Sequence, residues 1–306
     1  MMLRASAQQL GPAIEGTRRQ WRPGGSCAGQ VCYYVAEHEH GRPLVFVHDL
    51  RPTSSAYEMR PLFECFRWRR PTFAIDLPGF GLSERAVPSF STAALADVLE
   101  ELCRKLRRAD LAADVVALGR GSELVARVAR DAPGLVRSLV MLEPSGLLSD
   151  GGNAIERVTA RLAGVLGERF ARSVFALIAT RPMVRRALRA RFRGAPNEGL
   201  VEYAHAAAQV PNAHRVPLAA LAAPTRRPGA PSLYHSLTVP VLVVHDAHGP
   251  QAVELEAFLR GRANRFALRV SHTRGMPQFE RRVDTFEALD RFWQALARTA
   301  RDQAMR

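Results

Sequence analysis

The chain has 306 residues, of which 47% are hydrophobic, and it carries a formal net charge of +14. This length and apolar content suit one large α/β domain or two smaller domains with a substantial core. No run of about 18 uncharged apolar residues is present, so we expect no transmembrane helix. The first residues lack the apolar segment of a secretory signal, which indicates a cytoplasmic protein.

The positive charge comes almost entirely from arginine, because Lys105 is the only lysine. The arginines are spread over several predicted elements, and the sequence contains no nucleic-acid-binding motif. The charge therefore predicts a basic surface exposed to water and argues against a nucleic-acid partner.

Strand and helix patterns alternate along the chain after a polar segment. We interpret residues 1–25 as a loosely held arm. The alternation that follows predicts a mainly parallel sheet between layers of helices. The predicted strands cover residues 31–37, 43–48, 74–76, 115–118, 139–142 and 239–245, and the predicted helices cover residues 54–66, 91–108, 124–132 and 283–300.

A long helical stretch interrupts this alternation over residues 145–237. It is rich in arginine and punctuated by proline. Its first half interleaves apolar residues with arginines, a pattern that suits a helix lying on an anionic membrane. An ordinary amphipathic helix, with its apolar side on the protein and its arginines in water, has the same pattern, and we favour it.

Several short motifs carry a resemblance to a known family. Residues 43–48 form an apolar strand that ends at His48, and residues 74–85 read AIDLPGFGLSER. Residues 115–126 read VVALGRGSELVA, which is typical of a strand, a sharp turn and a helix. Residues 273–280 read TRGMPQFE. Together these motifs resemble the α/β-hydrolase superfamily, whose nucleophile lies in a G-x-S-x-G turn.

The resemblance covers about residues 31–300. It implies an α/β-hydrolase fold, with a mostly parallel sheet of the eight-stranded type flanked by helices. Residues 26–144 and 238–306 would form the core of this fold. Residues 145–237 would form a helical cap over the active site.

The resemblance also assigns three catalytic positions, and each of them is glycine. Gly121 takes the place of the nucleophile, with Gly119 as the first glycine of the turn. Gly249 takes the place of the acid after the seventh strand, and Gly275 takes the place of the histidine two residues before Pro277. A glycine has no side chain that could attack a substrate or transfer a proton. We therefore expect a degenerate triad at the carboxyl edge of the sheet and no ordinary hydrolase activity.

The resemblance further places His48 and Asp49 in the oxyanion loop, with Asp49 where glycine is usual. We expect these two residues, Gly121 and Ser122 to form the floor of a largely apolar cavity under the cap. The expected occupant is a small apolar or amphiphilic ligand, and a partner protein is the alternative. We expect no cofactor and no metal ion. Glu143, at the end of the sixth strand, is interpreted as a carboxylate at the edge of the core that pairs with a nearby arginine.

Two enzymatic alternatives remain open. An ester or lactone hydrolase could use a displaced set of Ser122, Asp246 and His272, provided that these side chains reach hydrogen-bond distance. Tight packing of the strand against the helix argues against that shift, because Arg120 and Leu124 would occupy positions that require small side chains. A non-hydrolytic enzyme could instead use the same pocket and oxyanion loop without a nucleophile.

Overall fold

The structure is a computed structural model, and it describes residues 10–24, 29–86, 91–107, 111–147, 167–222, 230–246 and 250–305. The strands are β1 (Thr17–Trp21), β2 (Val31–Ala36), β3 (Leu44–Val47), β4 (Thr72–Asp76), β5 (Ala113–Leu118), β6 (Val136–Leu142), β7 (Val241–His245) and β8 (Arg265–Arg269). The helices before β6 are η1 (Ala56–Met59), α1 (Arg60–Phe66), α2 (Thr92–Leu106) and α3 (Gly121–Asp131). The later helices are α5 (Glu168–Ile178), α6 (Arg181–Arg189), α7 (Glu198–Ala208), α8 (Arg215–Ala222), α9 (Ala230–His235), α10 (Pro250–Leu259), α11 (Pro277–Glu280) and α12 (Arg282–Ala304).

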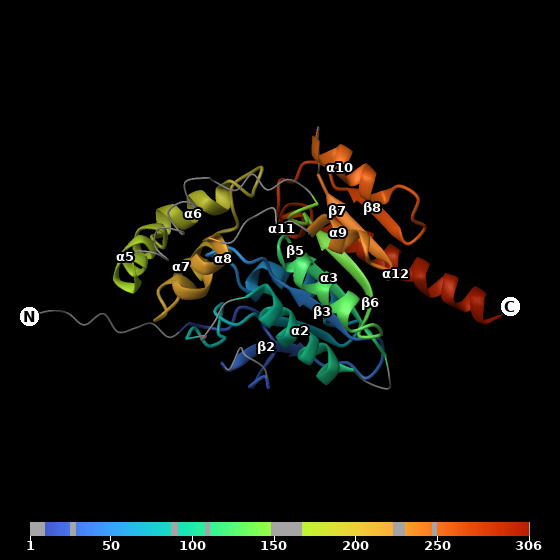
Figure 1. The fold of residues 1–306 in the computed structure, drawn as a ribbon, viewed down its shortest axis with the longest axis horizontal. Helices are drawn as coiled ribbons and strands as arrows, with labels where there is room; N and C mark the ends of the chain where they lie inside the picture. Colours follow the sequence, from blue (N-terminus) through green and yellow to red (C-terminus); the bar gives the residue numbers. More distant parts are fainter. Residues whose placement is uncertain are drawn as a thin grey trace, which may run out of the picture.

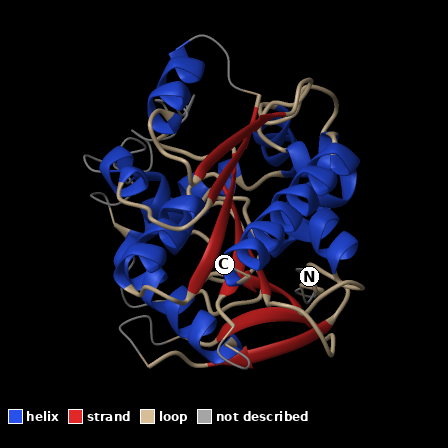
Figure 2. Ribbon diagram, turned by 90° about the vertical axis from the view of Figure 1, so that its right-hand side faces the viewer, coloured by secondary structure: helices blue, strands red, loops and turns tan. Residues whose placement is uncertain are grey.

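The eight strands form one sheet in the order β1-β2-β4-β3-β5-β6-β7-β8, and helices cover both of its faces (Figures 1 and 2). The strands from β3 to β8 are all parallel, while β2 runs antiparallel to both β1 and β4. Strands β3 to β7 are buried along their whole length apart from one residue of β6, as expected for a parallel sheet covered on both faces. The predicted fold class is therefore confirmed. All six parallel strands end at one edge, which is where the site is built.

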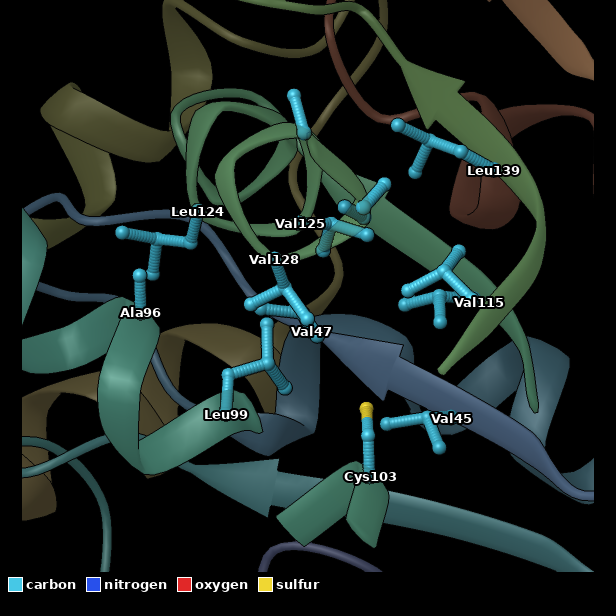
Figure 3. Packing of buried hydrophobic residues seen from close by; sticks show 14 of the residues in the cluster. Val45, Val47, Ala96, Leu99, Cys103, Val115, Leu124, Val125, Val128 and Leu139 are labelled. Atoms are coloured by element: carbon cyan, nitrogen blue, oxygen red, sulfur yellow. The ribbon is translucent and has the colours of Figure 1, made fainter. Parts of the chain in front are cut away.

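Side chains that alternate along the strands enter two separate cores. Val45 and Val47 of β3 face α2 and α3, where they pack with Leu99 and Val128 (Figure 3). The intervening Phe46 enters the core on the other face, with residues of α1 and α12. Because successive side chains of a strand point to opposite faces of the sheet, this alternation decides which core each residue enters.

The first strand corrects the expectation of a loose N-terminal arm. Thr17–Trp21 pairs with β2 from Thr17 opposite Val35 to Trp21 opposite Val31. Only Trp21 of this strand is buried, so the sequence shows no apolar alternation. Its backbone hydrogen bonds with β2, which the residue pattern does not reveal, hold the strand at the edge of the sheet.

Helices α5 to α9 lie between β6 and β7 in the sequence, and described residues of this segment contact elements at the carboxyl edge of the sheet. Tyr203 of α7 stacks on Tyr57 of η1, with 5.1 Å between the ring centroids. The guanidinium of Arg85, which follows β4, donates to the carbonyl of Ala207 at 3.2 Å. We call the described residues between β6 and β7, which are 143–147, 167–222 and 230–240, the insertion. In the described part of the chain, no helix combines the length and the apolar character needed to cross a membrane.

Candidate functional site

The turn between β5 and α3 has a glycine apex, but that apex is Gly119. Gly119 follows the last residue of β5 and has a φ of 53°. Residues with side chains adopt this left-handed conformation only with strain. Gly121, which we expected at the apex, is instead the first residue of α3. The positive φ places the motif at Ala117-x-Gly119-x-Gly121, two residues earlier than predicted, with alanine in the place of the first glycine.

Gly121 allows α3 to approach β3 closely. A Cβ atom on Gly121 would lie 2.5 Å from the carbonyl oxygen of His48 and 3.3 Å from Cγ1 of Val47. The first distance is far shorter than a van der Waals contact, and the carbonyl belongs to backbone that cannot yield easily. Gly121 is therefore a packing residue and not the nucleophile position.

The carboxylate of Asp49 fills the space that a side chain at the apex would need. A Cβ on Gly119 would lie 2.6 Å from Asp49 Cγ and 2.7 Å from each carboxylate oxygen. Asp49 Oδ1 accepts hydrogen bonds from the backbone N–H groups of Leu50 at 2.8 Å and Arg120 at 2.9 Å. One donor lies in the loop after β3, and the other follows the apex. These are the positions from which an oxyanion hole takes its two N–H groups in this kind of turn.

Two guanidinium groups hold the other carboxylate oxygen of Asp49. Arg51 Nε lies 2.9 Å and Arg191 Nη2 lies 3.2 Å from Asp49 Oδ2. Arg191 Nη1 also donates to Glu58 Oε1 at 2.6 Å, and Glu58 Oε2 accepts the N–H of Asp49 at 3.0 Å. Burial opposes ionisation of Asp49, but the guanidinium groups and the N–H donors outweigh it and lower the pKa of Asp49 to about 2. Asp49 is thus a buried, ionised and fully engaged carboxylate.

His48 supports the backbone beside this carboxylate. Its Nε2 accepts the N–H of Leu77 at 3.0 Å, and its Nδ1 lies 2.5 Å from the carbonyl oxygen of Asp49. Because a carbonyl oxygen only accepts, this pair of contacts assigns the ring proton to Nδ1. His48 therefore has a structural role in the loop.

Arg191 also joins the insertion to the predicted histidine position. A Cβ on Gly275 would lie 3.5 Å from the carbonyl oxygen and 3.7 Å from Cβ of Arg191. Gly275 lies on the loop that follows the carboxyl end of β8. Gly249, the predicted acid position, lies outside the described residues.

The described hydrogen bonds do not join Ser122, Asp246 and His272 to one another. Ser122 is buried in α3, and its Oγ donates to the carbonyl of Ala117 at 3.4 Å. The carboxylate of Asp246 accepts the N–H of Thr273 at 3.3 Å and lies 3.2 Å from Arg269 Nε. His272 is exposed on the loop after β8. The three residues thus lie in separate environments and do not form a hydrogen-bonded set.

Glu143, at the end of β6, is half-buried and has a strained backbone. Its φ is 46°, which is unusual for a residue with a side chain. Its Oε1 accepts the N–H of Asp246 at 2.9 Å. Burial, followed by the neighbouring Asp246 carboxylate, raises the pKa of Glu143 to about 7. The place at the edge of the core agrees with the interpretation, but among the described residues no arginine forms an ion pair with Glu143. Residue order also gave no signal for the strained backbone.

The expected floor residues do not line the cavity that the structure shows. His48, Asp49 and Ser122 are at most 1% exposed, and Gly121 is buried as well. An open cavity of about 570 Å³ lies elsewhere, between the end of α6 and α11. Among the described residues, no cluster of three or more histidine, cysteine or acidic side chains could hold a metal ion.

Comparisons with known proteins agree with this architecture. The model of the alpha/beta hydrolase family matches residues 44–300. Similar solved structures include the epoxide hydrolase CorEH, with a TM-score of 0.70, 20% identity, and coverage of 92% of this chain and 99% of that one. Cfl2 from Burkholderia cenocepacia has a TM-score of 0.71 and 19% identity, with coverage of 90% and 95%. A thermophilic esterase from Thermogutta terrifontis has a TM-score of 0.66 and 19% identity, with coverage of 92% and 99%.

At these identities the solved structures establish the fold alone. The comparison with curated proteins gave no match. The family model, in contrast, spans most of the sequence, from β3 into α12. The chain therefore belongs to the α/β-hydrolase family.

Proposed function

We propose that this chain is a non-hydrolytic member of the family, in which its own Asp49 carboxylate occupies the oxyanion hole. The observation that carries the proposal is the pair of hydrogen bonds from Leu50 and Arg120 to Asp49 Oδ1. In acyl transfer, such donors stabilise the negative charge that develops on the substrate oxygen. Gly119 at the apex supplies no nucleophile to create that charge. The turn therefore lacks both a nucleophile and a free oxyanion hole, and acyl transfer requires both.

A substrate would have to displace Asp49 against its ion pairs. The side chain of Asp49 is 1% exposed and that of Arg191 is 11% exposed, so water screens their contact little. Breaking one partner out of a buried ion pair costs about 3–5 kcal/mol. A cost of that size would weaken substrate binding by a factor of about 100 or more. The ion pairs thus keep the Asp49 carboxylate in the oxyanion hole.

A carboxylate in this place could itself attack a substrate and form an ester, as nucleophilic carboxylates do. The contacts of Asp49 argue against that reaction. Oδ1 accepts two N–H groups, Oδ2 lies against two guanidinium groups, and the low pKa of Asp49 reflects a charge that its neighbours already stabilise. Neither oxygen is presented to a cavity that the structure shows. We therefore assign Asp49 a blocking role.

For a chain without hydrolysis we favour a binding role over a non-hydrolytic enzyme, because His48, Asp49 and Ser122 are buried and do not line the described cavity. We propose a small amphiphilic ligand as the partner, with a protein partner as the second possibility. The retained fold, together with an insertion packed on the edge where ligands bind in open α/β sheets, supports this role. The support comes from placement, because the insertion contacts the core through Arg191, Tyr203 and Ala207.

A labelling experiment tests the loss of chemistry. The wild-type protein is incubated with a serine-directed fluorophosphonate and, separately, with 4-nitrophenyl acetate, beside an active serine esterase as a positive control. We expect no covalent label and no saturable turnover. Stoichiometric labelling, or turnover that disappears in a Ser122→Ala variant, would contradict the proposal.

A further inference from the structure

The open cavity of about 570 Å³ lies where the insertion meets the C-terminal part of the chain. Phe192 and Arg193, just after α6, form one side of it. His272, Phe279 and Arg281, on and around α11, form the other side. Its volume falls within the range of small-molecule sites, which is about 300–1,000 Å³.

Two aromatic rings form the apolar part of the wall. The rings of Phe192 and Phe279 lie 6.0 Å apart between centroids and are inclined by 60°. Phe192 is buried and Phe279 is half-buried, so part of the second ring faces the cavity. A wall of this kind offers dispersion contacts to an aromatic or other apolar body.

Cationic side chains form the polar part of the wall. Arg193 Nη1 lies 4.0 Å from Asp246 Oδ2 and Arg281 Nε lies 3.2 Å from Asp284 Oδ2, and the two arginine side chains are 57% and 47% exposed. Ion pairs whose guanidinium groups are open to water contribute little free energy, so an anionic ligand can compete for both groups. Glu280 is the acidic residue of the lining, and its two oxygens accept the N–H groups of Arg193 at 2.6 Å and Arg274 at 3.0 Å. The carboxylate of Glu280 is therefore engaged by backbone donors. An anion in the cavity would take the two guanidinium groups from their partners Asp246 and Asp284 and form charge-assisted hydrogen bonds with them.

His272 lies on the same wall with a φ of 65°, in the left-handed region that side-chain-bearing residues rarely adopt. The next residue, Thr273, holds the loop in this shape. Its N–H donates to Asp246 at 3.3 Å, and its hydroxyl donates to the carbonyl of Val270 at 3.0 Å. Such strain persists where the surrounding contacts enforce it, and it is concentrated at binding and catalytic sites.

We propose that this cavity binds a small organic anion with an apolar body. The carboxylate or an equivalent acidic group contacts Arg193 and Arg281, and the body packs on Phe279. The proposal gives a ligand class to the binding role proposed above. The ligand is placed at the junction of the insertion with α11, and not beside the β5–α3 turn as expected from the sequence. Because the test measures binding of a probe that cannot be hydrolysed, its failure would leave the proposal of a blocked oxyanion hole unaffected.

Calorimetric titration with 1-naphthoate tests the proposal. Naphthalene-1-carboxamide provides the same body without the charge, and inorganic phosphate provides an anion without the body. We expect saturable binding of 1-naphthoate, at least about tenfold weaker binding of the amide, and no binding of phosphate. A single charge-assisted contact of this kind is worth about a factor of ten in affinity.

Variants locate the site. Arg193→Ala and Arg281→Ala should each weaken 1-naphthoate binding by about tenfold, because each removes one guanidinium contact. Arg298→Ala removes an exposed arginine of α12 that does not line the cavity, and it should bind as wild type does. No binding to the wild type at millimolar probe, equal affinity for the amide, or wild-type affinity in both cavity variants would each overturn the proposal.

Discussion

Replacing Asp49 with asparagine should destabilise the fold and change its response to acid. The ordinary pKa of 3.8 falls to about 2 for Asp49 in the folded protein. That difference is equivalent to about 2 kcal/mol of stability from the charge of one carboxylate. Asparagine keeps an oxygen for the N–H groups of Leu50 and Arg120 but loses the charge that faces Arg191. We therefore expect Asp49→Asn to lower the free energy of unfolding by about 2 kcal/mol at pH 7.

The sign of the pH dependence follows from the lowered pKa. The contribution of Asp49 is fully present above pH 4 and is lost as the pH falls through about 2, because the unfolded chain takes up the proton first. Urea unfolding should therefore show the largest gap between wild type and Asp49→Asn above pH 4 and a shrinking gap toward pH 2. Combining Asp49→Asn with Arg191→Met should cost less than the sum of the two single changes, because the pair is coupled. Equal stability of wild type and Asp49→Asn from pH 7 to pH 2 would refute the reasoning.

Three further predictions concern the turn, the carboxyl group at the end of β6 and the displaced set. Gly119→Ala should destabilise the protein more than Gly134→Ala does, measured by urea unfolding. Both glycines have a positive φ, which costs alanine about 1–2 kcal/mol. Only a Cβ on Gly119 would collide with the Asp49 carboxylate, whereas a Cβ on Gly134 meets no atom within 4 Å. Equal losses of stability in the two variants would contradict the conclusion that Asp49 fills the space at the apex. Burial raises the pKa of Glu143, so the folded state favours its protonated form, and stability should decline as the pH rises from 4.5 through about 7. Glu143→Gln should remove that decline in unfolding midpoints between pH 5 and pH 8, and an unchanged slope would show that the group does not titrate there. Aryl-ester hydrolysis should change less than twofold in each variant of the displaced set, whereas a loss of about a hundredfold in kcat/KM would establish that set as catalytic. These variants are Ser122→Ala, Asp246→Asn and His272→Ala.

Local pattern was sufficient for the architecture and for the kind of turn, but it placed the apex two residues too late. The sequence offers Gly119 and Gly121 in an alternating pair, and Ala117 replaces the first glycine of the motif. Both registers satisfy the residue pattern. Only the backbone conformation separates them, since the positive φ falls on Gly119.

The contacts of Asp49 could not be read from residue order. Arg120 and Arg191 lie far from Asp49 along the chain, and they meet it because β3, β5 and the insertion converge at one edge of the sheet. The unusual aspartate in the oxyanion loop was the signal available, since a charged side chain there needs partners once it is buried. The strand β1 was missed for a different reason, because only one of its side chains is buried.

The rate of 4-nitrophenyl acetate hydrolysis by wild type and by Asp49→Gly tests the central claim most directly. Circular dichroism first establishes that both proteins are folded, with Asp49→Ala as a second variant. If the carboxylate blocks the hole, removing it frees the N–H groups of Leu50 and Arg120 for the substrate oxygen, and a single such donor is worth about 10²–10³ in rate. The account predicts an increase of about a hundredfold over wild type. An unchanged rate would show that Asp49 does not block the hole, and a fall below the wild-type rate would show that its carboxylate takes part in catalysis.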